Sequence, residues 1–322
     1  MFNLNTLPKT VIAALCAMAA VFCFSINDSS IKFLSGDYAL HQIVLLRSVL
    51  GMIILIAVFV PMAGTFTILK TNRIGFHLLR GLCVVFANMT FFLGISVLPL
   101  AEGTAIFFIS PLLITVFSVI FLKEKVGVHR WGAVVVGLIG VVIILRPGTA
   151  AFTLASLLPI GAAVGYASLH MLTRYIGKTE SALTMSFYIQ MTFIIICTGF
   201  GIVAGDGRYA GQESAPLEFL FRAWAPLAPA DWPIFLLIGV ASAFGGFLIS
   251  QAYRIAEAGM VAPFEYIAMP LSILWGFMIF DVIPGVTTLG GMALIMFSGL
   301  YVIWRETVKK TAEVTPAPRY RR

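Results

Sequence analysis

The chain has 322 residues, of which 60% are hydrophobic and only 11% are charged, and its mean hydropathy is +1.00. Soluble domains carry about 25% charged residues, so this composition excludes an ordinary soluble protein and indicates a multi-pass membrane protein. The formal net charge is +7. A basic chain can bind nucleic acid, but here the basic residues are placed along the chain as membrane topology requires, and we expect no nucleic-acid partner.

The N-terminal apolar segment begins after Lys9 with VIAALCAMAA, which has the composition of a secretory signal. The apolar run continues toward Phe33, and this is too long for the core of a cleaved signal. We therefore predict a retained first span. The four cysteines all lie inside apolar runs without a CxxC pair, so neither a metal site nor a disulfide framework is indicated.

Hydropathy over windows of about 19 residues predicts ten transmembrane helices in an all-α integral membrane protein. Each apolar run is long enough to cross about 30 Å of hydrocarbon at a rise of about 1.5 Å per residue. The spans are expected near 10–33, 39–60, 75–97, 101–122, 128–146, 153–174, 182–204, 232–253, 259–281 and 284–304.

The lysines and arginines between these spans predict the orientation. With the N-terminus inside, fifteen of them fall on the cytoplasmic side and three, Arg146, Arg208 and Arg222, fall outside. This bias follows the positive-inside rule. We expect a multi-pass protein of the bacterial inner membrane with both termini in the cytoplasm.

The second half of the chain repeats part of the first. A shift of 159 residues without a gap places Pro111 on Pro270, Gly140 on Gly299 and Arg146 on Arg305. Five spans per half is an odd number, so the two copies must cross the membrane in opposite directions, as in many secondary transporters. Pro111 and Pro270 are predicted to be paired bend points in their helices.

This duplication predicts the domain organisation. Residues 1–9 form a cytoplasmic N-terminus, 10–146 a first five-helix repeat and 147–304 a second five-helix repeat. The second repeat contains a long outer loop, 205–231, in which LEFLFRAW suits either a short amphipathic helix or a disordered connector. Residues 305–322 form a basic cytoplasmic tail.

Several polar residues lie at lipid depth, where a charge is costly unless it has a partner. On the first span, Asp28 and Lys32 have the spacing of an acid-before-base ion pair, which is either a wall of the substrate path or structural. Arg47 lies halfway along the second span, and structural pairing is the favoured interpretation. Arg80 shares a face of the third span with Asn88, so it is a candidate for a gate.

Glu265 is the strongest candidate for a functional residue. It lies early in the ninth span between two prolines, Pro263 and Pro270, which free backbone carbonyls and loosen the helix. Such a carboxyl suits proton coupling or binding of a cationic or hydrogen-bond-donating substrate. The alternative is a structural pair with Arg47 or Arg80.

Many aromatic residues are present, and most are expected to pack or to anchor the chain at the membrane interface. Phe108, Tyr166 and Tyr266 lie on polar faces and could stack on a planar metabolite. The sequence has no GxxxxGK[ST], HExxH or GxSxG motif, and its four histidines are scattered. We therefore predict no enzyme activity, no cofactor and no metal site.

Four segments carry a resemblance to a known family: LPLAEGTAIFFISPLL, the following KEK, RWGAVVVGLIGVVIILRPG and APFEYIAMPLSILWGFMIFD. With them the chain resembles an EamA-type member of the drug/metabolite transporter superfamily over residues 10–305. The family pattern has Gly-Glu before the second-half break. This chain has Phe280, Asp281 and Val282 there instead, which puts any role of that acid in doubt.

The resemblance implies two inverted five-helix EamA repeats, no ATP hydrolysis and alternating access around a central cavity. The cavity is implied to be lined by the first, third, fourth, sixth, eighth and ninth helices, which carry Asp28, Arg80, Glu265 and Tyr266 but not Arg47. The implied substrates are small metabolites, and an importer of a riboflavin-like vitamin is the preferred hypothesis. An exporter of amino acids or drugs and a transporter of a nucleoside-like cofactor such as S-adenosylmethionine are the alternatives, and a homodimer is considered beside the monomer.

Overall fold

The structure is a computed structural model that describes residues 8–122, 127–149, 152–177, 179–256 and 261–314. Every regular element in these ranges is helical, as the composition predicts. The KEK segment at 123–125, which is part of the resemblance to the family, lies outside the described residues. So do the ends of the chain at 1–7 and 315–322.

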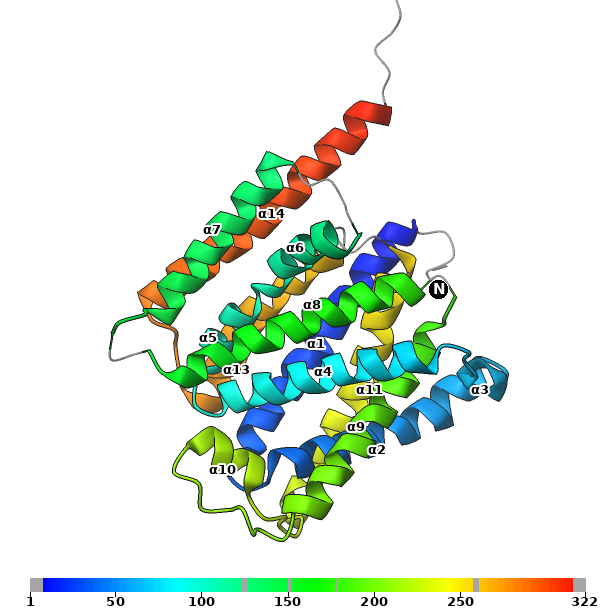
Figure 1. The fold of residues 1–322 in the computed structure, drawn as a ribbon, viewed down its shortest axis with the longest axis vertical. Coiled ribbons are helices and arrows are strands. Elements are labelled where there is room, and N and C mark those ends of the chain that lie inside the picture. Colours follow the sequence, from blue (N-terminus) through cyan, green and yellow to red (C-terminus); the bar gives the residue numbers. More distant parts are fainter. Residues whose placement is uncertain (1–7, 123–126, 150–151, 178, 257–260, 315–322) are drawn as a thin grey trace, which may run out of the picture.

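Helices of α, 3₁₀ and π type follow one another along the chain (Figure 1). The elements are α1 (Lys9–Leu34), α2 (Leu40–Ile54), η2 (Leu55–Phe59), α3 (Val60–Met62), η3 (Phe66–Leu69), α4 (Ile74–Ile95), α5 (Leu100–Phe107), α6 (Ser110–Leu122), α7 (Val128–Leu145), η4 (Leu154–Leu157), α8 (Leu158–Ile176), α9 (Ala182–Ala204), α10 (Ala215–Phe221), η5 (Pro229–Asp231), α11 (Trp232–Ile255), η6 (Ala262–Ile267), α13 (Ala268–Phe280) and α14 (Val286–Val314).

Seven helical segments among the described residues are long and apolar enough to cross a membrane. They are Lys9–Leu34, Leu40–Met62, Ile74–Ile95, Leu100–Phe121, Leu154–Ile176, Ala182–Ala204 and Pro229–Ile255. Three shorter apolar helices, Trp131–Leu145, Phe264–Phe280 and Val286–Tyr301, coincide with the remaining predicted spans. The protein is therefore an all-helical membrane protein with at least seven candidate spans.

Two of the apolar segments are interrupted. α5 ends at Phe107 and α6 begins at Ser110, so the predicted fourth span is two helices joined at Phe108 and Ile109. In the predicted ninth span the 3₁₀ helix η6 changes to the α-helix α13 at Ala268. Pro111 and Pro270 each lie in the first turn of the helix after the interruption, where a missing N–H does no harm.

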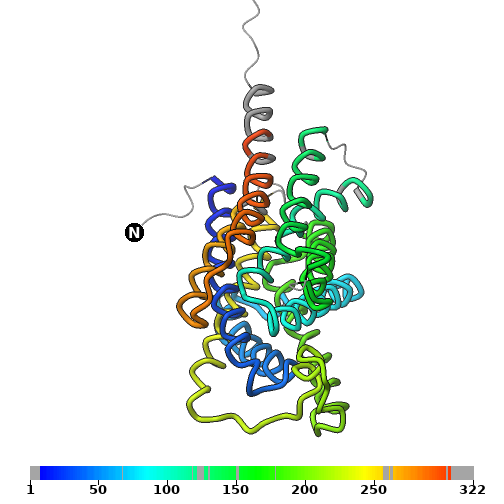
Figure 2. Tube along the Cα trace, turned by 90° about the vertical axis from the view of Figure 1, so that its left-hand side faces the viewer, coloured from blue at the N-terminus to red at the C-terminus, as the bar shows by residue number. Residues whose placement is uncertain are grey.

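Five helix pairs make the most extensive contacts of the bundle: α1 with α11, α4 with α8, α7 with α14, α2 with α11, and α2 with α9. Figure 1 shows α7 and α14 side by side at one edge, and Figure 2 shows the same pair in the view turned by 90°. α7 and α14 approach closely at Gly140 and Gly291, because a Cβ atom on Gly140 would lie 2.8 Å from the Gly291 carbonyl oxygen. Small residues at such a crossing let the two backbones touch.

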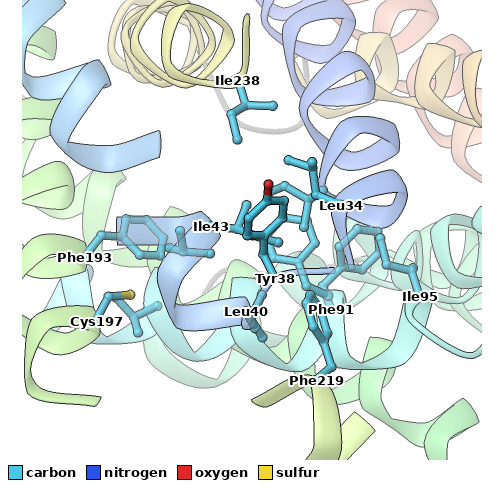
Figure 3. Close-up of a cluster of buried hydrophobic side chains, with 14 of the residues drawn as sticks. Leu34, Tyr38, Leu40, Ile43, Phe91, Ile95, Phe193, Cys197, Phe219 and Ile238 are labelled. Carbon is cyan, nitrogen blue, oxygen red and sulfur yellow. The ribbon is translucent and has the colours of Figure 1, made fainter. Parts of the chain in front are cut away.

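A large apolar cluster fills the end of the bundle where α1 turns into α2 (Figure 3). Its buried residues include Leu34, Leu40, Phe193 and Phe219. Phe219 belongs to α10, a short helix inside the 205–231 loop. Of the two alternatives that the sequence left open for this loop, the structure therefore has the short helix, and Phe219 of this helix is buried in protein.

Hydrogen bonds also fix this loop to the α1–α2 turn. Arg222 Nη1 donates to the carbonyl oxygens of Ser35 at 2.9 Å and Gly36 at 2.6 Å. Gln42 and the backbone of Ala225 exchange two hydrogen bonds, of 2.6 and 3.1 Å. We refer to residues 205–231 as the cap, because they close this end of the bundle in Figure 1.

Candidate functional site

A cavity of about 170 Å³ lies between the helices, at mid-length of the bundle. It is lined by residues of α1, α2, α4, α5, α8, α9, α11, η6 and α13. The resemblance of the sequence to its family implied fewer helices, because α2 and α9 were not expected to contribute. Most of the lining is apolar, and its charged residues are Asp28, Arg47, Arg80 and Glu265.

Arg47 lines this cavity from the middle of α2 and is only 3% exposed. Its guanidinium donates to the amide oxygens of Asn27 at 3.4 Å and Asn88 at 3.3 Å. It also lies 4.9 Å from the ring centre of Phe193 and 5.7 Å from that of Phe92. Neutral amides and ring faces stabilise a cation that is excluded from water.

The prediction of a structural ion pair at Arg47 is therefore wrong for the described residues, since none of their carboxylates is within salt-bridge distance of the Arg47 guanidinium. The sequence places Arg47 correctly at lipid depth but does not show which helices face it. Because α2 packs between α9 and α11, Arg47 points inward. Among the described residues it has no salt-bridge partner, and its charge faces the cavity.

Asp28 is half-buried on α1, and its carboxylate accepts a hydrogen bond from the amide of Asn27 at 3.0 Å. The expected pair with Lys32 is not formed. Lys32 Nζ instead donates to the carbonyl oxygens of Ile95, the last residue of α4, at 2.5 Å and of Leu98 at 2.8 Å. These carbonyls have no helical partner, so they attract the ammonium group away from the cavity.

Arg80 lies on α4, lines the cavity and is 1% exposed. Its Nε donates to the hydroxyl oxygen of Thr173 at 3.0 Å. Its Nη1 has no hydrogen-bond partner among the described residues. His170, one turn before Thr173 on α8, also lines the cavity, and neither of its ring nitrogens has a partner there. Both side chains can therefore bind a polar ligand without breaking an existing hydrogen bond.

Glu265 lies within the 3₁₀ helix η6 on the opposite wall and is 5% exposed. Its Oε2 accepts a hydrogen bond from the hydroxyl of Tyr166 on α8 at 2.8 Å, and its Oε1 accepts one from Tyr253 on α11. The ring of His170 lies between these tyrosines, 4.2 Å from Tyr166 and 4.0 Å from Tyr253, measured between ring centres. The structural pair of Glu265 with Arg47 or Arg80 is not formed.

The aromatic candidates divide between two faces. Phe108 and Tyr166 line the cavity, as does Asn88. Tyr266, which was predicted to bind substrate, does not line it, and its ring packs 5.3 Å from that of Phe108 and against Gly299 of α14. In a 3₁₀ helix successive residues point about 120° apart, so Glu265 and Tyr266 cannot face the same wall.

Sequence reasoning missed three residues of the site. Asn27 and His170 line the cavity, and Tyr253 binds Glu265 from outside the lining. His170 follows Tyr166 by four residues and so shares its helix face, which is a signal that the sequence contains. No sequence signal identifies Tyr253. Among the described residues no three His, Cys, Asp or Glu side chains are grouped closely enough to hold a metal ion.

Comparisons with known proteins bear on this cavity. Residues 11–146 match the EamA-like transporter family. A riboflavin transporter of Vibrio cholerae is 30% identical over 93% of this chain and 95% of its own, and an S-adenosylmethionine uptake transporter of Rickettsia prowazekii is 27% identical over 94% and 96%. A pseudopaline exporter of Pseudomonas aeruginosa is 24% identical over 88% and 92%. One solved crystal structure superposes with a TM-score of 0.63 at 16% identity over 90% of this chain and 96% of that chain, which shows a shared fold.

Proposed function

We propose that this chain, which belongs to the EamA-like transporter family, imports a riboflavin-like vitamin by secondary-active, alternating-access transport. It is a multi-pass protein of the bacterial inner membrane and carries a small metabolite, as its transporter relatives do. The proposal concerns the identity of that metabolite, the direction of transport and the residues that bind it.

The observation that carries the proposal is the composition of the cavity wall. Aromatic rings from α4, α5 and α9 surround it, and side-chain amides and hydroxyls stand between them. A flavin ring is planar and has hydrogen-bond donors and acceptors along one edge. Rings that stack on a planar ligand and amides that bind its edge are what such a substrate requires. Asn88, Phe108 and Tyr166 are the proposed contacts, with Asp28 and Arg80 at the polar end.

The pattern of helix contacts supports ten crossings in two inverted repeats, 10–146 and 147–304. If each helix of the first half is paired in order with one of the second, the α1–α11 contact corresponds to the α8–α4 contact. The α2–α9 and α7–α14 contacts correspond to themselves. Such an exchange is expected of two copies related by a two-fold axis in the membrane plane. The bias of basic residues supports a cytoplasmic location for both termini.

A second candidate substrate, a zwitterion of the S-adenosylmethionine type, is favoured by the charges in the cavity. Two arginines and two acids line the same space, and no salt bridge joins them among the described residues. Unpaired charges of both signs suit a ligand that carries a carboxylate and a cationic group. Arg80 would bind the carboxylate, and the half-buried Asp28 would face the cation.

The two candidates are distinguished by binding to the purified protein in detergent. Quenching of flavin fluorescence measures riboflavin binding, and calorimetry measures S-adenosylmethionine binding. Phe91→Leu removes a ring from the cavity wall, whereas Phe86→Leu changes the same helix at a residue that is 51% exposed and lies outside the lining. A stacked ring contributes about 0.5–1.5 kcal/mol, so Phe91→Leu should weaken flavin binding by about two- to tenfold.

The Phe86→Leu variant should bind riboflavin as the unmodified protein does. Equal loss in both variants would mean that the ring of Phe91 does not contact the ligand. Tight binding of S-adenosylmethionine together with absence of flavin quenching would reject the riboflavin hypothesis and leave the second candidate.

A further inference from the structure

The carboxyl group of Glu265 is held in an unusual way for a buried acid. Both of its oxygens accept hydrogen bonds from phenol groups, one on α8 and one on α11. Among the residues that the structure describes, no Lys, Arg or His lies within salt-bridge distance of it. Two hydroxyl donors offset part of the cost of burying the charged form, but no positive charge compensates it.

The ionisable groups around Glu265 come from each neighbouring helix. α8 contributes Tyr166 and His170, and α11 contributes Tyr253. α1 and α4 contribute Asp28 and Arg80 through the shared cavity. α13 has no ionisable residue, and α14 places Gly299 against the adjacent Tyr266. The tyrosines are the only ionisable groups in this described set that are bonded directly to the carboxyl.

Protonation of Glu265 changes the hydrogen bonds that join three elements. As a carboxylate it accepts from both tyrosines, so η6 is tied to α8 and to α11. As a neutral acid its own O–H must donate, and one tyrosine must then accept this proton and direct its own O–H elsewhere. Since Glu265 lines the cavity, water and protons that enter the cavity can reach it.

We propose that Glu265 binds one proton from one side of the membrane and releases it on the other in each transport cycle, so that substrate uptake is proton symport. Tyr166 and Tyr253 transmit the change in charge to α8 and α11. Only an O–H bond forms and breaks, and the proton is supplied and taken up by water. This inference rests on the proposed function, because it names the ion that drives the same transport.

Asp28 is a poorer site for this proton. The residue is half-buried, and its carboxylate accepts a hydrogen bond from the amide of Asn27 on its own helix. The carboxyl of Asp28 therefore has no direct hydrogen bond to another described helix that a change in its charge could break. Glu265 is the cavity acid whose charge state decides contacts between elements.

The test uses the full chain in proteoliposomes with labelled riboflavin and, in parallel, labelled S-adenosylmethionine. Counterflow at equal pH measures exchange without a driving force. Uptake against a gradient, with the outside one pH unit more acidic and the membrane potential clamped at zero, measures coupling. One-proton symport should accumulate substrate by about tenfold for each pH unit.

Glu265→Gln keeps the size and an acceptor oxygen but cannot release a proton. We expect this variant to retain counterflow and to lose accumulation, so that its internal and external substrate concentrations become equal. Glu102→Gln is the matched control, because Glu102 is a half-buried helix carboxylate that accepts from Thr288 at 3.0 Å outside the cavity lining. It should accumulate substrate tenfold. Tyr253→Phe removes one donor from the carboxylate and should shift the pH profile of uptake toward alkaline pH.

Tenfold accumulation by Glu265→Gln would overturn the inference. So would an unmodified protein that exchanges substrate but does not respond to the pH gradient, and in that case the proposed transport function would stand. Absence of counterflow with both substrates in the unmodified protein would overturn the proposed function and this inference with it.

Discussion

The cap is predicted to be held on the bundle mainly by one side chain, Phe219. This residue is 2% exposed and belongs to the apolar cluster beneath α10. Replacement of a buried Phe by Ala costs about 3–5 kcal/mol. Leu217 lies on the same short helix but is 42% exposed, and Ala at such a surface position changes stability by only about 0.5 kcal/mol.

The cap contains its own internal reference for measuring this difference by trypsin cleavage. The side chain of Arg208 is 57% exposed, so trypsin can cut there without opening the cap. Arg222 directly follows α10, and its guanidinium is bound to the carbonyl oxygens of the α1–α2 turn. Cleavage at Arg222 therefore requires the cap to detach. Where opening is fast, the cleavage rate follows the population of the open form.

Phe219→Ala should raise cleavage at Arg222 relative to Arg208 by at least about a hundredfold, since about 1.4 kcal/mol corresponds to a factor of ten. Leu217→Ala should change this ratio by no more than about threefold. Fragment masses at early times measure both sites in one sample. A similar ratio in the two variants would show that the cap is held by its hydrogen bonds and not by the buried ring.

Two further predictions concern the α7–α14 crossing and the cap. Gly291→Ala places a methyl group 2.7 Å from the Gly140 carbonyl oxygen, whereas the methyl group of Gly290→Ala meets open space. Gly291→Ala should therefore be less stable than Gly290→Ala by about 1–3 kcal/mol. Equal thermal midpoints of the two variants would refute this prediction. The hydrogen bond to Asp231 raises the pKa of Tyr38. The contribution of this bond to stability is therefore present below about pH 10 and is lost as the pH rises through the pKa of the folded state. A difference titration at 295 nm against Tyr38→Phe measures this pKa, and a value for Tyr38 at or below about pH 10 would contradict the prediction.

Much of the fold follows from local properties of the sequence. A run of apolar residues at lipid depth must be helical, because no other backbone satisfies its own hydrogen bonds there. Such a helix tolerates a proline best in its first turn, which is where Pro111 and Pro270 lie. The cost of a buried charge likewise singles out Arg80 and Glu265, and both line the cavity.

The partners of these charges do not follow from local properties. Lys32 and Asp28 have ideal spacing for an ion pair. The carbonyl oxygens at the end of α4 lie within reach of Lys32, however, and they bind it in place of Asp28. Arg47 finds amides of two other helices, and no one-dimensional pattern shows which helices those are. Tyr266 directly follows Glu265, and adjacent residues of a helix point in different directions, so its ring packs on Phe108 and Gly299 and does not enter the cavity.

The two interrupted segments differ in the one respect that a coupled transporter needs. Under the 159-residue shift Ile106 corresponds to Glu265, and Ile106 is 2% exposed within an apolar cluster. Two identical inverted halves would pack equally well in the inward-open and outward-open states, so neither state would be favoured by a proton. A carboxyl on one wall only makes the energy of the two states depend on its charge. In the proposed cycle the repeated scaffold therefore permits the exchange of states, and the unrepeated Glu265 ties that exchange to the proton gradient.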